Sequence, residues 1–277
     1  MSFGSRLRSA MDVRGQLCVG IDPHPELMDA WGLTDSVFGL ERFAMTALEA
    51  VGGMVPVLKP QSAFFERHGS GGIDVLEKLI AGSRALGALV LLDVKRGDVG
   101  STSQAYADAY LTPGSPLAVD AITVNPFLGL GSLDPLIDTA LRHDAGVFVV
   151  ALTSNPEGAL FQRATTVEGR TVAGTILEAV ATRNAGTQGL GSVGAVIGAT
   201  VGDIRERLDV NGPLLVPGIG AQGGTLEDVC RIFSSVLPNV LPSSSREILG
   251  AGPSKQQLHG AAQAAIERFS GLVAPDS

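Results

Sequence analysis

The stretch LVLLDVKRGDVG, residues 89–100, joins a short apolar run directly to a group of charged residues. An unbroken run rich in leucine and valine is typical of a strand buried on both faces, as in a parallel sheet covered by helices. Asp93, Lys95 and Asp98 come at its end, so this strand is expected to finish in charged side chains. A buried strand that carries charges at its carboxyl end is the pattern from which the rest of the chain can be interpreted.

Apolar runs of the same character recur along the chain. With the first one they predict strands at residues 17–21, 55–59, 89–95, 119–125, 147–153, 193–200, 213–217 and 239–243. Segments with the apolar spacing of helices lie between them, at residues 40–51, 73–86, 133–142, 171–184, 226–233 and 254–269. Eight such repeats over about 250 residues favour a closed (β/α)8 barrel, because an open doubly wound sheet more often has roughly five to seven strands and a dinucleotide-binding motif.

The distribution of glycine and proline indicates one domain. Both residues are spread along the whole chain, whereas a linker between domains would concentrate them in one place. We therefore expect an α/β protein that forms a single (β/α)8 TIM barrel over residues 1–277. A long loop after the fifth strand, at about residues 154–169, is expected on the rim of the barrel.

Composition narrows the possible functions. The net charge is −8 and only 17% of residues are charged, which argues against a nucleic-acid-binding surface. No apolar run approaches the roughly 18 residues of a membrane span, and the first residues lack the pattern of a signal peptide. We expect a cytoplasmic protein that binds neither nucleic acid nor membrane. Cys18 and Cys230 form no C-x-x-C motif and are expected to be free thiols.

Charged residues stand at the ends of the first three predicted strands, where the active site of a (β/α)8 barrel lies. Asp22 follows the first strand and Lys59 ends the second, while Asp93, Lys95 and Asp98 end the third. Asp93 and Lys95 are two residues apart and should project to the same side of their strand. Alternating charges in a low-dielectric mouth suit a reaction that moves a proton or stabilises a carbanion. Lysine can remain protonated there, since nearby carboxylates raise its pKa.

Simpler interpretations apply to single residues of this set. Any one of the charges alone could be a solvated strand end or an ion pair that closes a loop. A Schiff base at either lysine is disfavoured because the flanking acids favour the charged amine. Residues 243–245 are serines without a recognisable histidine partner, so a serine nucleophile is not expected. A metal site is not expected either, because ligand spacing is lacking among His24, His68, His143 and His259.

The last two predicted strands carry a different signal. The seventh runs into PGIGAQGG, residues 217–224, and the eighth into SSSR, residues 243–246. Loops after strands seven and eight form the usual phosphate site of such barrels. Glycines allow the main chain to approach an anion closely, and Arg246 could bind phosphate through two hydrogen bonds. The glycines alone could be a flexible turn, but together with Arg246 they predict a phosphorylated ligand.

These residues resemble the orotidine 5′-phosphate decarboxylase family in its longer bacterial form. The resemblance extends from Asp22 to Arg246. Its most specific parts are Lys59, the signature D-x-K-x-x-D-V-G-x-T at residues 93–102, and the string at residues 217–224. The chain departs from the family pattern at Ser103, where an apolar residue or threonine is usual, and at Ser245, where many members have glycine.

The resemblance implies a carbon–carbon lyase of pyrimidine biosynthesis that converts orotidine 5′-phosphate to uridine 5′-phosphate without a metal or organic cofactor. Lys95 would protonate C6 of the pyrimidine as carbon dioxide departs, and Asp93 would face the substrate carboxylate and hold Lys95. Lys59 and Asp98 would complete the catalytic set. The implied substrate contacts are Asp22 and Lys59 at the ribose hydroxyls, Ser154 at the pyrimidine, and Gln222, Ser245 and Arg246 at the phosphate. In the family Asp98 and Thr102 reach the neighbouring subunit's site, so a homodimer with shared active sites is expected.

Two other functions stay open. A keto-sugar phosphate decarboxylase or hexulose-phosphate synthase of the same barrel group has the D-x-K-x-x-D motif but depends on Mg²⁺; Lys59 on the second strand and the loop of Gln222 disfavour it. A barrel that only binds a phosphorylated ligand is the other alternative. Charges at every expected strand end argue against a protein without catalytic activity, although function cannot be inferred from fold alone.

Overall fold

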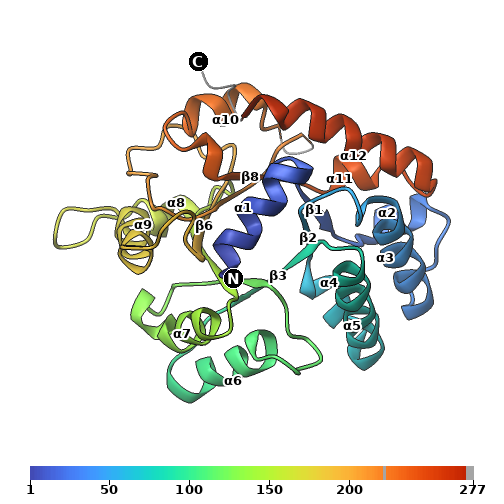
Figure 1. Ribbon diagram of the computed structural model, residues 1–277, viewed down its shortest axis with the longest axis horizontal. Coiled ribbons are helices and arrows are strands. Elements are labelled where there is room, and N and C mark those ends of the chain that lie inside the picture. Colours follow the sequence, from blue (N-terminus) through green and yellow to red (C-terminus); the bar gives the residue numbers. More distant parts are fainter. Residues whose placement is uncertain (221–222, 273–277) are drawn as a thin grey trace.

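The computed structural model describes residues 1–220 and 223–272 of the chain. Within these residues eight parallel strands form one closed barrel, in which each strand pairs with the next and β8 pairs with β1 (Figure 1). The strands are β1 (Cys18–Ile21), β2 (Val57–Pro60), β3 (Leu89–Arg96), β4 (Ala121–Val124), β5 (Gly146–Leu152), β6 (Val193–Ile197), β7 (Leu214–Pro217) and β8 (Val240–Ser244). The (β/α)8 barrel predicted from the sequence is confirmed.

Helices surround this barrel; most of them lie around its outside, whereas the first lies across one end (Figure 1). They are α1 (Phe3–Arg14), α2 (Pro25–Ala30), α3 (Val37–Val51), α4 (Ser62–Glu66), α5 (Gly69–Ala85), α6 (Gly100–Leu111), α7 (Asp134–Arg142), α8 (Gly158–Gln162), α9 (Val172–Arg183), α10 (Leu226–Ile232), α11 (Arg246–Leu249) and α12 (Lys255–Phe269). Short 3-10 turns lie at Leu130–Leu133, Leu237–Asn239 and Ser270–Leu272. In the part of the chain described, none of the helices is both long and apolar enough to span a bilayer.

The predicted elements differ from the observed ones mainly at their ends. Each predicted strand overlaps an observed one, and the largest difference is at β6, which ends at Ile197 instead of residue 200. The six predicted helices correspond to α3, α5, α7, α9, α10 and α12, whereas the other six helices of the described residues were not predicted. The loop expected at residues 154–169 contains one of these, α8, and an antiparallel bridge joins Thr165 to Thr171.

The first helix, α1, closes the amino-terminal end of the barrel and crosses its centre in Figure 1. Phe3 packs edge-to-face on Phe148 of β5, with ring centroids 6.0 Å apart. Gly146 makes room for it, because a Cβ there would lie 2.3 Å from the Phe3 ring. Apolar side chains seal this end of the barrel interior, whereas the buried charges of Lys59 and Asp93 lie towards the opposite, carboxyl-terminal mouth.

Two apolar layers account for the stability of this arrangement. Inside the barrel, side chains such as Val57, Leu91, Phe148 and Leu241 form one cluster with α1. A larger cluster lies between the outward-facing strand residues and the surrounding helices. Burial of apolar surface on both sides explains why the strands are almost continuously hydrophobic. Polar residues buried within the strands therefore stand out as exceptions that need a specific partner.

Candidate active site

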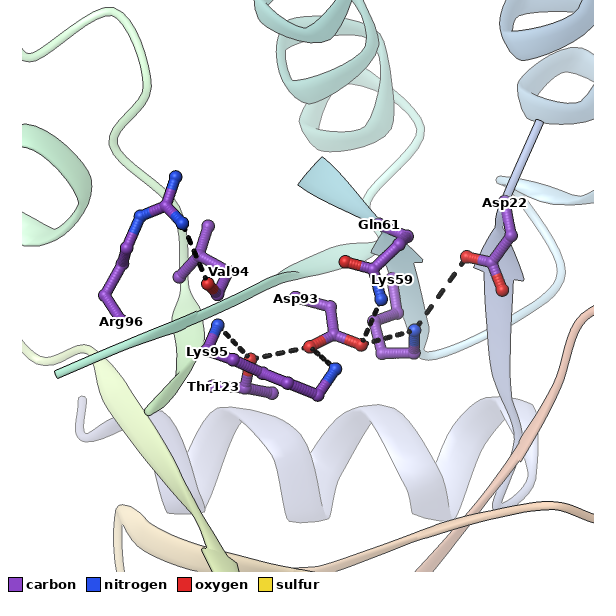
Figure 2. Close-up of polar contacts among 8 residues, drawn as sticks. All are labelled: Asp22, Lys59, Gln61, Asp93, Val94, Lys95, Arg96 and Thr123. Carbon is purple, nitrogen blue, oxygen red and sulfur yellow. Dashed lines mark hydrogen bonds and ion pairs between the residues drawn. The ribbon is translucent and has the colours of Figure 1, made fainter. Parts of the chain in front are cut away.

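The carboxyl ends of β1, β2 and β3 bring four charged residues into one row (Figure 2). Lys59 Nζ lies 3.9 Å from Asp22 Oδ1 and 3.2 Å from Asp93 Oδ2. Lys95 Nζ lies 2.7 Å from Asp93 Oδ1. The charges therefore alternate in sign along the row from Asp22 through Lys59 and Asp93 to Lys95. The sequence placed these residues at strand ends, and the structure brings all four together.

Asp93 is the centre of this row, because four donors converge on its carboxylate (Figure 2). Lys95 Nζ and the hydroxyl of Thr123 each donate to Oδ1 at 2.7 Å. Lys59 Nζ and the amide of Gln61 donate to Oδ2 at 3.2 and 3.0 Å. The carboxylate is thus held in one orientation by groups from three different strand ends.

The electrostatics of the two buried charges follow from this arrangement. Burial by itself would raise the pKa of Asp93, but Lys59 and Lys95 outweigh it and hold the pKa far below its usual range. Burial would likewise lower the pKa of Lys59, but Asp22 and Asp93 outweigh it and raise the pKa above the ordinary value. Both residues are therefore charged throughout the neutral pH range. The side chain of Lys95 is 47% exposed and that of Lys59 is 7% exposed, so Lys95 is the lysine of the row that is open to the mouth.

The main chain at Lys95 is strained. Its φ angle is +44°, a left-handed conformation that side-chain-bearing residues rarely adopt. The register between β3 and β4 shifts between Leu92 and Arg96, so the strand is bulged where the charges lie. A regular strand was expected to place the side chains of Asp93 and Lys95 on one side; in the structure they meet through a bulge instead. Strain of this kind persists only where surrounding contacts hold it.

Contacts on both sides hold the bulge. On the inner side the Lys95 N–H donates to Thr123 Oγ1 at 3.0 Å. On the outer side Arg96 forms an ion pair with Glu66 of α4 at 2.6 Å and lies 5.6 Å from the centroid of the Tyr106 ring. The bulge is therefore anchored by β4 on one side and by α4 and α6 on the other.

Two polar contacts of the row, Gln61 and Thr123, were not predicted from the sequence. Gln61 directly follows β2, and it bridges to Asp93 in the sheet. Thr123 is 1% exposed and lies in β4, two residues after the inward-facing Ala121. A polar residue on the inner face of an otherwise apolar strand was the available signal for Thr123, but a neutral side chain is a weaker sign of a functional site than a charged one.

The other predicted residues of the third-strand signature lie just beyond the row. Asp98 is half-buried and accepts a hydrogen bond from the Val99 N–H at 2.8 Å. Thr102 is exposed in the first turn of α6. Ser103, which departs from the family signature, is fully buried, and its hydroxyl donates to the carbonyl of Ser132 at 3.1 Å. That hydrogen bond explains how a small polar residue is accommodated there.

The predicted phosphate side lies at the ends of β7 and β8. Arg246 is exposed at the first residue of α11. Within the described residues the Ser245 hydroxyl is buried without a hydrogen-bond partner, and it lies next to Gly20 of β1, where a Cβ would be 3.1 Å away. Gln222 lies outside the described residues. Ser154 is exposed two residues after β5, on the same rim.

The glycine loop before α10 folds back on itself. The Gly224 N–H donates to the Gly218 carbonyl at 3.0 Å, and Gly218, Gly220 and Gly223 all have φ between +73° and +96°. At Gly220 a Cβ would lie 2.4 Å from the carboxylate of Glu247, so glycine is required for two reasons. The loop is thus packed against α11, the helix that begins with Arg246.

Cys18 is fully buried, and burial raises its pKa to about 12, so the thiol stays protonated. Both cysteines are free, as expected. Among residues 1–220 and 223–272, no three histidine, cysteine, aspartate or glutamate side chains are grouped to hold a metal ion.

The barrel and its row of alternating charges define the class: a (β/α)8-barrel enzyme equipped for proton transfer or carbanion stabilisation. Comparison with known proteins identifies the family within that class. Residues 15–261 match the model of the orotidine 5′-phosphate decarboxylase / HUMPS family. The chain belongs to this family.

Individual relatives match most of the chain. It is 60% identical over 262 residues to the orotidine 5′-phosphate decarboxylase of Salinispora arenicola, covering 94% of each chain. Its identity to the enzyme of the same name from a Nocardioides species is 62% over 250 residues, covering 89% of this chain and 91% of the relative. A crystal structure from Streptomyces avermitilis superposes with a TM-score of 0.97 at 55% identity, covering 99% of this chain and 96% of that one.

Proposed function

We propose that this chain decarboxylates orotidine 5′-phosphate to uridine 5′-phosphate, a step of pyrimidine biosynthesis, and that it needs neither metal nor organic cofactor. The observation that carries this proposal is the row formed by Asp22, Lys59, Asp93 and Lys95, in a chain of which most matches curated decarboxylases. The row supplies one exposed ammonium group beside a carboxylate that cannot readily take up a proton.

The proposed reaction breaks the bond between C6 of the pyrimidine and its carboxylate. Carbon dioxide leaves, the electron pair stays on C6, and Lys95 transfers a proton from Nζ to that carbon. Asp93 faces the substrate carboxylate and destabilises it, while it also orients Lys95 through the 2.7 Å hydrogen bond. The positive charge of Lys95 stabilises the developing carbanion before the proton moves. The neutral amine then regains a proton from solvent.

Substrate binding is proposed for the remaining residues. Asp22 and Lys59 bind the ribose hydroxyls, and Ser154 binds the pyrimidine. Arg246 binds the phosphate together with Gln222 and the main chain at Ser245. Support comes from their placement, because the described ones lie on the carboxyl-terminal rim of the barrel.

Metal independence is supported by the contacts of Asp93. A divalent cation bound to this carboxylate would have to displace ammonium groups that lie 2.7 and 3.2 Å from its oxygens. The Mg²⁺-dependent sugar-phosphate activity considered above therefore has no obvious place at this carboxylate.

Absorbance spectroscopy tests the activity directly. Purified protein incubated with orotidine 5′-phosphate and an excess of chelator is expected to bleach the orotate absorbance. Folded protein that leaves the absorbance unchanged would rule out the proposed activity. Activity that disappears on chelation and returns with added Mg²⁺ would instead favour the sugar-phosphate group of the family.

We further propose that the active protein is a cytoplasmic homodimer with shared sites, in which Asp98 and Thr102 complete the site of the partner. Apolar side chains exposed on neighbouring rim loops support such an interface. Val99 is 56% exposed and Phe127 71%, and Phe127 contacts Phe161 edge-to-face at 5.5 Å between centroids. Exposed apolar side chains that contact one another, as Phe127 and Phe161 do, are typical of a protein–protein contact.

Mixing two inactive variants tests the shared site. In a mixed dimer of Lys95→Ala and Asp98→Ala chains, one site carries both defects and the other carries neither. Up to half of the sites in the mixed dimers should then work, whereas each variant alone should not. If subunit exchange is verified and no activity returns, the sites are not shared.

A further inference from the structure

Thr123 joins the two most constrained parts of the site. Its side chain is buried in β4, and it contacts the carboxylate of Asp93 and the main chain of Lys95 at the same time (Figure 2). No other side chain in the described residues makes hydrogen bonds to both of these residues through a single atom. Thr123 is therefore placed to fix the geometry between them.

The number of protons on each group determines the direction of these hydrogen bonds. The Lys95 N–H can only donate, so the threonine oxygen must accept from it at 3.0 Å. The hydroxyl has a single proton, which is then directed to Asp93 Oδ1 at 2.7 Å. The same carboxylate oxygen accepts from Lys95 Nζ at 2.7 Å. Thr123, the Lys95 main chain and the Lys95 ammonium group thus close a ring through Asp93.

This ring opposes relaxation of the strained main chain at Lys95. The φ angle of +44° is unfavourable for lysine, and the chain could relax if the N–H lost its acceptor. Relaxation would change the direction in which the Lys95 side chain leaves the main chain. Nζ would then move away from Asp93. A displacement of about 1 Å is enough to slow a positioned reaction by about 100-fold.

We infer that Thr123 is a positioning residue for the proton transfer, which it controls by holding Asp93 and the strained Lys95 main chain in register. The inference rests on the proposed function, since it concerns the same reaction. Thr123 is buried beneath Asp93 and acts through that residue and Lys95. Its loss should therefore affect the chemical step more than substrate binding.

The test replaces the hydroxyl without changing the shape of the side chain. Thr123→Val is expected to lower kcat by about 10- to 100-fold, with KM changed by less than about 3-fold, because a hydrogen bond to a charged group is lost. Thr123→Ser keeps the hydroxyl and should recover kcat to within about 3-fold of the natural protein. Thr139→Val is the matched control: Thr139 is equally buried, accepts from Gln104 at 3.3 Å, and lies on α7.

Two kinetic outcomes would overturn the inference. One is a Thr123→Val protein with unchanged kcat; the other is equal loss in Thr123→Val and Thr139→Val, which would indicate a general effect on folding. Crystal structures of the natural protein and Thr123→Val provide an independent measurement. The variant is expected to lose the contact between Lys95 Nζ and Asp93 and to relax the Lys95 φ angle. An unchanged geometry in the variant would reject the role of Thr123. A natural protein that did not decarboxylate orotidine 5′-phosphate would instead reject the proposed function, so the two failures can be told apart.

Discussion

The two halves of the carboxyl-terminal rim are built in different ways. At the β3 end Lys59, Asp93 and Lys95 are held by other side chains, and Asp93 alone accepts four hydrogen bonds. At the β7 and β8 ends Arg246 is exposed, and the neighbouring loop takes its shape from glycines with positive φ. Gly20 of β1 lies between the halves, because a Cβ there would meet both Ser245 and Asp22.

This difference separates two tasks. Side chains that must act on the reacting carbon are oriented by folding itself, so little reorganisation remains when the reaction occurs. A group that grips a distant anion can instead rely on main-chain conformation and one exposed arginine. We therefore expect substitutions at the β3 end to affect chemistry for every substrate, and substitutions at the β8 end to affect only substrates that carry phosphate.

The largest effect is expected at the β3 end. Lys95→Ala should reduce kcat by at least about 10⁴-fold, since it removes both the proton donor and the charge that stabilises the carbanion. The protein should still fold, because Asp93 keeps Lys59, Gln61 and Thr123 as partners. Turnover of orotidine 5′-phosphate measures the loss of kcat, and circular dichroism measures whether the variant is folded. Near-normal turnover would reject the proposed role of Lys95.

A smaller and selective effect is expected at the β8 end. Arg246→Ala should lower kcat for orotidine 5′-phosphate by about 10- to 100-fold, the range of lost hydrogen bonds to a charged group. Binding energy from the phosphate should act on kcat as well as KM, because it can hold the charged row in its working geometry. The nucleoside orotidine has no phosphate, so its slow reaction should hardly change.

The matched control for Arg246→Ala is Arg207→Ala, which removes an exposed arginine between β6 and β7. This variant should turn over both the nucleotide and the nucleoside at the rate of the natural protein. Equal slowing of nucleotide and nucleoside by Arg246→Ala would contradict the comparison between the two halves, since Arg246 would then act on the fold or on the chemistry.

The charged half of the site was the easier one to predict from sequence. Lys59, Asp93 and Lys95 interrupt strands that are otherwise apolar, and charged residues in such positions are conspicuous. Gln61 and Thr123 are neutral, so only the three-dimensional contacts reveal their role. The bulge at Lys95 could not be predicted either, because it depends on partners from β4, α4 and α6 that are distant in sequence.

The helices show the same limit. In α6 the sequence GSTSQAYADAYL is rich in small and polar residues. Its buried residues share one face, but Ser103 and Ala107 are too polar or too small to make that face a conspicuous apolar stripe. By contrast, α1 did carry a signal, because Phe3, Leu7 and Met11 are spaced four apart and all three are buried. That spacing indicates a helix with one apolar face, but its position at the end of the barrel follows only from the fold.

The smallest expected effect concerns acid stability, and it compares a carboxylate from each half. Asp93 and Glu247 both have lowered pKa values: in Asp93 the lysines overcome burial, and in Glu247 the hydrogen bonds from Arg268 are the main cause. A carboxylate whose pKa is lowered by folding stabilises the protein above its unfolded pKa, about 3.9 for aspartate and 4.3 for glutamate. That stability is lost as the pH falls towards the folded pKa.

Asp93→Asn should therefore be less stable than the natural protein at pH 7, by up to about 2 kcal/mol, and the difference should shrink as the pH falls below about 4. The amide keeps the shape of the side chain but leaves the ammonium groups of Lys59 and Lys95 without a counter-charge between them. Glu247→Gln should be less stable than the natural protein at pH 7 by only about 0.5 kcal/mol, because the ion pair of Glu247 with Arg268 is about one-third exposed and is screened by solvent. Urea unfolding between pH 3 and pH 7 measures both differences. A gap for Asp93→Asn that stayed constant with pH, or that was smaller than the gap for Glu247→Gln, would show that the β3 end is no more strongly organised by charge than the β8 end.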